Sequence, residues 1–186
     1  MQVRGPLMIE HRLIERLISR INRELRHIET SRRTDPLLID TIVDFIKTYA
    51  DRTHHGKEEE IYFQKLSEKT MSEADRHLMN ELIEEHKFGR KTTEALVAAN
   101  TRYGDGDTSA LNEIVAKLHT LAEFYPRHIE KEDKFLFPAA QAYFSEDEQQ
   151  VMLEAFWQFD RKMIHEKYEA VADGLENPSW FGGMPG

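Results

Sequence analysis

Two short stretches of this sequence contain side chains that could bind a metal ion. Each is a histidine followed four residues later by a glutamate: His54 with Glu58, and His128 with Glu132. On a helix, residues four apart lie on one face, so each pair would present an imidazole and a carboxylate together. A single exposed pair of this kind is common and contributes only about 0.3 kcal/mol. Here two further histidines accompany the pairs, and the candidate metal ligands are His11, His54, Glu58, His86, His128 and Glu132.

The elements that must position these residues are helices. Apolar residues recur at helical spacing along most of the chain, and no stretch alternates as a strand would. We expect long helices at about 7–30, 36–69, 72–103 and 108–143, and a shorter one at about 146–173. Asp35, Ser72 and Ser145 are suited to cap three of these helices, and Gly174 is suited to end the last.

The turns between the long helices are short, which favours antiparallel neighbours. The predicted fold is therefore all-α, an antiparallel up-down four-helix bundle over about 7–143 with an added C-terminal fifth helix. At 186 residues the chain is long enough for one substantial core, so we expect a single domain over 1–186. The Gly- and Pro-rich tail at 174–186 is expected to be loosely held.

One histidine continues the apolar stripe of each long helix, at a similar distance from the neighbouring turns. His11 and His54 lie 22 and 21 residues from the first turn, and His86 and His128 lie 20 and 22 residues from the third. In an antiparallel bundle, equal distances from a turn mean equal heights along the axis. All four histidines are therefore expected within about one helical turn of each other, at roughly 1.5 Å per residue.

The same residues form an internal repeat. Glu10 and His11 recur as Glu85 and His86, and the two His-x-x-x-Glu pairs follow these elements after 43 and 42 residues. The pair His55–Glu59 has the same spacing as His54–Glu58, but the repeat and the apolar stripe favour His54 and Glu58 as the inward residues. We expect His55 about 100° further around the helix, on the flank of the bundle.

A core lined by four imidazoles and two carboxylates requires an explanation, because unpaired buried carboxylates are costly. A hydrogen-bonded polar network is one explanation, and a metal site is another. Six ligands are too many for one tetrahedral zinc ion, and the chain has no cysteine for a structural zinc site. The set suits two ions bridged by carboxylates and solvent. Mixed nitrogen and oxygen ligands favour non-haem iron, with manganese or zinc also compatible.

At this point the ordered pattern H…HxxxE…H…HxxxE, through His11, His54, Glu58, His86, His128 and Glu132, resembles the hemerythrin-like proteins with an HHE cation-binding domain. The resemblance covers about 7–143, and the stretches EEEIYF and EDKFLFP are also similar to the family. It implies two iron ions in a four-helix bundle that binds or senses O₂, NO or peroxide. An iron-handling or redox enzyme, which donates iron to damaged clusters or reduces NO or peroxide, is the alternative.

One position departs from the family pattern. The oxygen-carrying hemerythrins have a second histidine one turn after the third-helix histidine, where this chain has Arg90. Arginine cannot serve as a ligand, so the ion near His86 is either more open or completed by His55, Glu59 or Glu15. The departure argues against simple reversible O₂ carriage and for a more reactive or sensory site.

Composition limits the class of partner. The net charge of −9 argues against general binding to nucleic acid. No apolar run approaches the ~18 residues of a membrane span, and the first residues lack the apolar core of a signal peptide. With no cysteine in the chain, we expect a cytoplasmic protein whose partner is a small diatomic ligand or peroxide.

Overall fold

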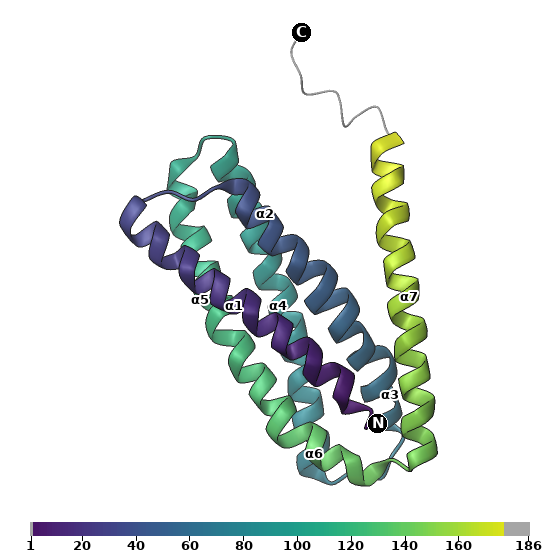
Figure 1. Cartoon of the computed structure of the whole chain (residues 1–186). Coiled ribbons are helices and arrows are strands. Elements are labelled where there is room, and N and C mark those ends of the chain that lie inside the picture. Colours follow the sequence, from purple (N-terminus) through teal and green to yellow (C-terminus); the bar gives the residue numbers. More distant parts are fainter. Residues whose placement is uncertain (1, 177–186) are drawn as a thin grey trace.

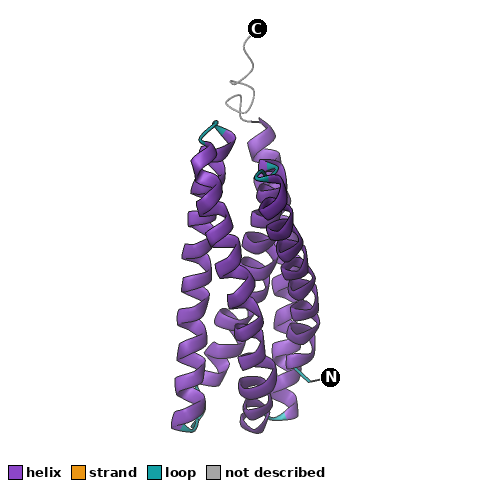
Figure 2. Ribbon diagram, turned by 90° about the vertical axis from the view of Figure 1, so that its left-hand side faces the viewer, coloured by secondary structure: helices purple, strands orange, loops and turns teal. Residues whose placement is uncertain are grey.

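The computed structural model describes residues 2–176, and all of its regular structure is helical (Figure 2). Four helical rods form the bundle, and a fifth helix, α7 (Glu146–Glu176), lies beside it (Figure 1). The first rod is α1 (Arg4–Ser31) and the third is α4 (Glu73–Gly104). The second rod comprises α2 (Pro36–Phe45), the π-helices η1 (Ile46–His55) and η2 (Glu58–Phe63), and α3 (Gln64–Ser67). The fourth comprises η3 (Thr108–Ala110), α5 (Leu111–Lys131), the π-helix η4 (Glu132–Leu136), α6 (Phe137–Ala140) and η5 (Gln141–Tyr143).

The predicted fold class is confirmed, and the helix ends follow the predicted caps. Asp35 accepts a hydrogen bond from the backbone N–H of Leu37, and Pro36 occupies the first turn of α2. Ser72 accepts one from the N–H of Asp75 at the start of α4.

The expected end of the last helix at Gly174 is wrong, because α7 continues to Glu176. A glycine inside a helix costs only about 1 kcal/mol, which a helix tolerates. The remaining part of the predicted tail, 177–186, lies outside the described residues.

Two apolar clusters fill the bundle, one on each side of a polar layer. The first cluster contains Ile14 to Ile28 of α1, the inner face of α2, and facing residues of α4 and α5. The second contains Leu7, Tyr62, Phe137 and residues of α7 such as Phe156. All the candidate ligands lie between these clusters, so the bundle shields them from water.

Helix α7 packs against the rod that contains the first His-x-x-x-Glu pair. The ring of Phe159 faces Gly56 so closely that a Cβ atom at Gly56 would lie 2.7 Å from its Cζ atom. Lys57, which is fully buried, makes an ion pair of 2.7 Å with Asp160 of α7. The added helix therefore covers the segment between His55 and Glu58.

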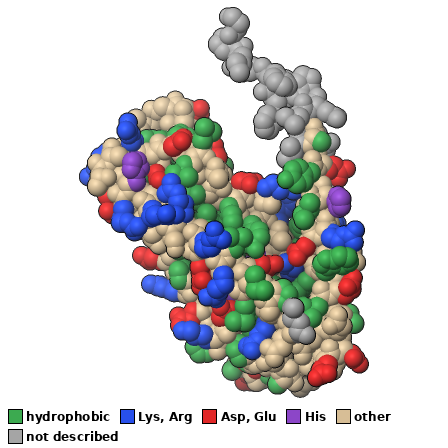
Figure 3. Space-filling view, viewed as in Figure 1, with side chains coloured by type: hydrophobic (Ala, Val, Ile, Leu, Met, Phe, Trp, Pro, Cys, Tyr) green, Lys and Arg blue, Asp and Glu red, His purple; other side chains and the backbone are tan. Residues whose placement is uncertain are grey.

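The outer face that α1 presents mixes acidic and basic side chains (Figure 3). Arg12 pairs with Glu15, and Arg20 pairs with Glu24 along this helix. Among the described residues, no helix combines the length and the apolar character that crossing a membrane requires.

Candidate metal centre

Seven buried side chains converge in the polar layer of the bundle. They form two groups whose potential ligand atoms lie within 4.8 Å of one another. The first group is His55, Glu58, His86 and His128, and the second is His11, His54, Glu58 and Glu132. Each of the seven is at most 2% exposed. Ligands on opposite sides of one ion lie about 4 Å apart, so each group has the dimensions of a metal site. The structure thus brings together all six residues selected from the sequence.

The two carboxylates lie between the groups, with one oxygen facing each. Glu58 Oε1 is 3.4 Å from His54 Nε2, whereas its Oε2 is 3.5 Å from His86 Nε2. Glu132 Oε2 is 3.1 Å from His11 Nε2, whereas its Oε1 is 3.3 Å from His128 Nε2. This arrangement is suited to carboxylates that bridge two ions.

A second layer of carboxylates orients the histidines through their outer nitrogens. The distances from Nδ1 to the carboxylate oxygen are 2.8 Å for His11 and Asp133, 2.9 Å for His54 and Glu10, 3.4 Å for His55 and Asp51, 2.6 Å for His86 and Glu59, and 2.9 Å for His128 and Glu85. A carboxylate that accepts from Nδ1–H places the lone pair of the ring on Nε2. Metal-binding histidines are typically held in this way.

The inner atoms of the site are therefore nearly all acceptors. Both oxygens of Glu58, both oxygens of Glu132, and Nε2 of His11 and His55 are buried without a hydrogen bond from the described residues. Buried polar atoms without partners are costly, and acceptors that face one another repel. Only cations in their midst can satisfy them, whether protons or metal ions. The residues present thus fit a metal centre.

The pKa shifts indicate which of these buried groups would hold protons when no metal is bound. Burial and the negative charge of Glu132 raise the pKa of Glu58 well above its usual range. Burial alone would also raise the pKa of Glu132, but His128 when charged, and His11 and His86 when they carry a proton on Nε2, hold it well below that range. Burial lowers the pKa of His11, but the hydrogen bond to Asp133 and the contact with Glu132 that forms when Nε2 is protonated outweigh it and raise the pKa to about 9. A proton in the cluster would thus be held by Glu58 in preference to Glu132, and metal binding would displace it.

The expected position of His55 on the flank is wrong. His55 is 2% exposed, and its ring stacks on that of His86 with centroids 3.8 Å apart. The expectation assumed about 100° of rotation per residue, which holds for an α-helix. The segment Ile46–His55 is instead a π-helix, in which hydrogen bonds span five residues and each residue turns through a smaller angle. Both His54 and His55 therefore face the core.

The structure also places Arg90 and the two other residues, Glu59 and Glu15, that could have completed the ligand set in its place. Glu59 contacts His86 through Nδ1, on the side away from the other ligands, so it supports His86 rather than joining the group. Glu15 lies on the exposed side of α1, paired with Arg12. Arg90 donates from Nε to Asp51 and from Nη2 to Glu59, both at 2.7 Å. Of the three candidates, only His55 joins the first group.

Sequence reasoning missed the second layer, although the repeat contained its signal. Glu10 and Glu85, already noted as the repeated partners of His11 and His86, support His54 and His128. The residue after each ligand glutamate, Glu59 or Asp133, supports the histidine of another helix. The residue before it is a lysine, and Lys57 pairs with Glu10 as Lys131 pairs with Glu85. The approximate two-fold repeat therefore extends through the second layer.

The unequal burial of these two lysines leads to a prediction. Lys57 is fully buried between Glu10 and Asp160, whereas Lys131 is 29% exposed. Lys57→Met should lower the free energy of unfolding of the metal-free protein by about 3 kcal/mol, because it leaves the largely buried carboxylate of Glu10 uncompensated. Lys131→Met is the matched control and should cost less than about 1 kcal/mol. Urea unfolding measures both, and equal losses would contradict the prediction.

The remaining four histidines are exposed and belong to neither group: His27, His77, His119 and His165.

An all-α bundle with buried histidines and two carboxylates between its helices is a metal-binding helical domain. The family model described as the hemerythrin HHE cation-binding domain matches residues 6–140. The chain belongs to this family, which confirms the resemblance inferred from the motif. The match includes all seven residues of the centre and ends before α7. Comparisons with curated proteins and with solved structures found no match.

Proposed function

We propose that the core binds two iron ions, one in each group, and that this di-iron centre binds or senses O₂, NO or peroxide. The observation that carries the proposal is the convergence of buried acceptors. Four carboxylate oxygens lack donors within the described chain, and imidazole Nε2 atoms surround them. Each carboxylate directs one oxygen to each group, so two divalent cations, one in each group, would compensate all four oxygens. A single cation in one group would leave the oxygens that face the other group without a partner.

The residues proposed to hold the ions follow from the two groups. His55, His86 and His128 would bind one ion, and His11 and His54 would bind the other. Glu58 and Glu132 would bridge them, because each directs one oxygen to each group. Five imidazoles and two carboxylates form a mixed nitrogen and oxygen set without thiolate, which suits non-haem iron.

A small ligand is proposed because the protein offers few ligands to each ion. With Glu58 and Glu132 shared, the chain would supply five side chains to the ion of the first group and four to the ion of the second. Iron commonly takes up to about six ligands, so positions remain for solvent or a small molecule. Bound iron would supply electrons and a coordination position. The chain itself excludes bulk water through the two apolar clusters and fixes each imidazole through its Nδ1 partner.

The choice of ligand is tested by optical spectroscopy of protein loaded anaerobically with Fe(II). We expect exposure to O₂, NO or azide to produce new absorption bands, with different bands for each ligand that binds. The proposed function is wrong, and iron has only a structural role, if iron is bound but its spectrum stays the same with O₂, NO, azide and peroxide.

Metal should also stabilise the fold, because it satisfies the buried acceptors. At a free metal concentration 100 times the Kd, linkage gives about 2.7 kcal/mol, and Tm should rise by about 5 °C or more. Thermal melts with metal and with a chelator measure this change. Equal Tm values would contradict binding in the core and would indicate a weak surface site instead.

A further inference from the structure

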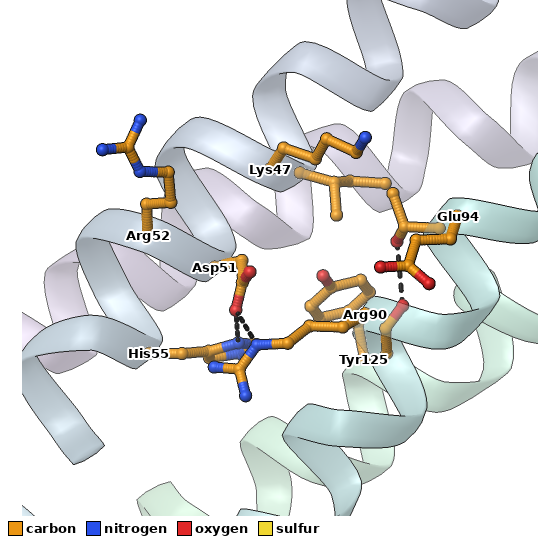
Figure 4. Close-up of a pocket in the computed structure, with 10 residues that line it drawn as sticks. Lys47, Asp51, Arg52, His55, Arg90, Glu94 and Tyr125 are labelled. Carbon is orange, nitrogen blue, oxygen red and sulfur yellow. Dashed lines mark hydrogen bonds and ion pairs between the residues drawn. The ribbon is translucent and has the colours of Figure 1, made fainter. Parts of the chain in front are cut away.

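A pocket of about 210 Å³ opens beside the metal centre, between η1 and α4. Its walls include Ile46, Gly89, Thr93 and Tyr125. Figure 4 shows the carboxylate of Asp51 in contact with both the ring of His55 and the guanidinium of Arg90, with Lys47 and Arg52 on the same helical rod as Asp51. A water molecule occupies about 30 Å³ of the liquid, so the pocket admits molecules of a few atoms but no large organic cofactor.

The pocket reaches the metal centre through His55. This residue lines the pocket and also belongs to the first group, with its Nε2 buried and without a hydrogen bond from the described chain. Four further pockets lie on the described part of the molecule, one of them under α7 and one between α4 and α5, and none of these four is lined by a residue of the centre. The pocket therefore provides a short path from solvent to an imidazole of the first group.

Arg90 stands at the side of this path and is connected to the centre. The Asp51 oxygen that accepts from Arg90 Nε also lies 3.4 Å from His55 Nδ1. The Glu59 oxygen that accepts from Arg90 Nη2 also lies 2.6 Å from His86 Nδ1. Arg90 lines both this pocket and the pocket under α7, so its side chain forms part of the wall between them. Its side chain is 34% exposed and is held in this wall by Asp51 and Glu59.

We propose that this pocket is the path by which small neutral or singly negative molecules reach the ion bound by His55, His86 and His128, and that Arg90 controls its width. The lining has three cationic side chains, Lys47, Arg52 and Arg90, and two anionic ones, Asp51 and Glu94. This balance disfavours cations. The inference rests on the proposed function, because it requires a metal ion in the first group.

The test narrows the pocket without touching the centre. Thr93 is buried, lines the pocket, and is none of the seven residues or their Nδ1 partners. Its hydroxyl makes only a hydrogen bond to the carbonyl of Gly89 within its own helix. In Thr93→Phe, a phenyl ring would fill part of the pocket. Thr120→Phe is the matched control, because Thr120 lines a different pocket, between α4 and α5.

Azide binding to the iron-loaded protein is measured by stopped-flow absorbance, with iron content and the final spectrum recorded for each variant. For Thr93→Phe we expect the association and dissociation rate constants to fall by the same factor, about tenfold or more, with Kd within about twofold of the parent. An obstruction on the path changes both rates equally, whereas distortion of the centre changes Kd and the spectrum. Arg90→Ala should raise the association rate constant, and Thr120→Phe should leave both unchanged.

An association rate constant for Thr93→Phe within twofold of the parent, at full iron content, would overturn the proposed path. If this variant does not fold, Ile46→Phe narrows the same pocket and is judged by the same result. Parent protein that takes up iron but shows no azide band would overturn the path and the proposed ligand binding together. A normal azide band in the parent with no effect in Thr93→Phe would overturn the path alone.

Discussion

Replacing Glu58 by alanine should abolish binding of both metal ions. Glu58 belongs to both groups and directs one oxygen to His54 and the other to His86. Without it, each group has lost a ligand and the negative charge that compensates the cations. Metal analysis after anaerobic iron loading and gel filtration should show close to no iron in Glu58→Ala.

Glu59→Ala is the matched control, since the two glutamates are adjacent but Glu59 contacts the outer nitrogen of His86. It should retain both ions with an affinity about 10- to 100-fold lower, the usual effect of losing a supporting carboxylate. The metal-free Glu58→Ala protein should be at least as stable as the parent, because burial and the negative charge of Glu132 make the ionised carboxylate unfavourable there. Full iron content in Glu58→Ala would show that the ions bind elsewhere.

Replacing His55 by alanine should remove one ion and leave the other. His55 belongs only to the first group, whereas His11 and His54 lie in the second. We expect at least about a 100-fold loss of affinity at the first group, because a direct ligand contributes more than a supporting residue. A metal titration followed by absorbance should show one tight site in place of two.

The exposed His119 provides the control for His55, since His119→Ala removes an imidazole far from the centre. It should retain both tight sites. If His55→Ala also retained both tight sites, His55 would not be a metal ligand despite its burial.

The sequence was most informative for helix starts and for the heights of the four repeated histidines. Ser72 and Ser145 mark helix starts because their hydroxyls accept backbone N–H bonds, which is a local property. The four repeated histidines could be placed at one height, because residues equally far from a turn lie side by side in antiparallel helices. These are His11, His54, His86 and His128. Burial of all four follows from their place in the apolar stripe.

The misplacement of His55 has a physical cause that local sequence does not reveal. A π-helix forms where the packing of side chains outweighs the normal four-residue hydrogen bonds, and both His-x-x-x-Glu segments contain or adjoin one. The docking of α7 was equally hidden. It depends on Phe159 against Gly56 and on Asp160 beside Lys57, residues about 100 positions apart in the chain. In contrast, the second-layer carboxylates were predictable, because the repeat includes Glu10 with Glu85.

If both groups of buried ligands are metal sites, one chain binds two iron ions. The most direct measurement is elemental analysis of protein loaded anaerobically with Fe(II) and freed of unbound metal, with protein concentration determined independently. We expect two iron atoms per chain, one for each group. A stoichiometry of one zinc ion per chain, with no uptake of iron, would contradict it.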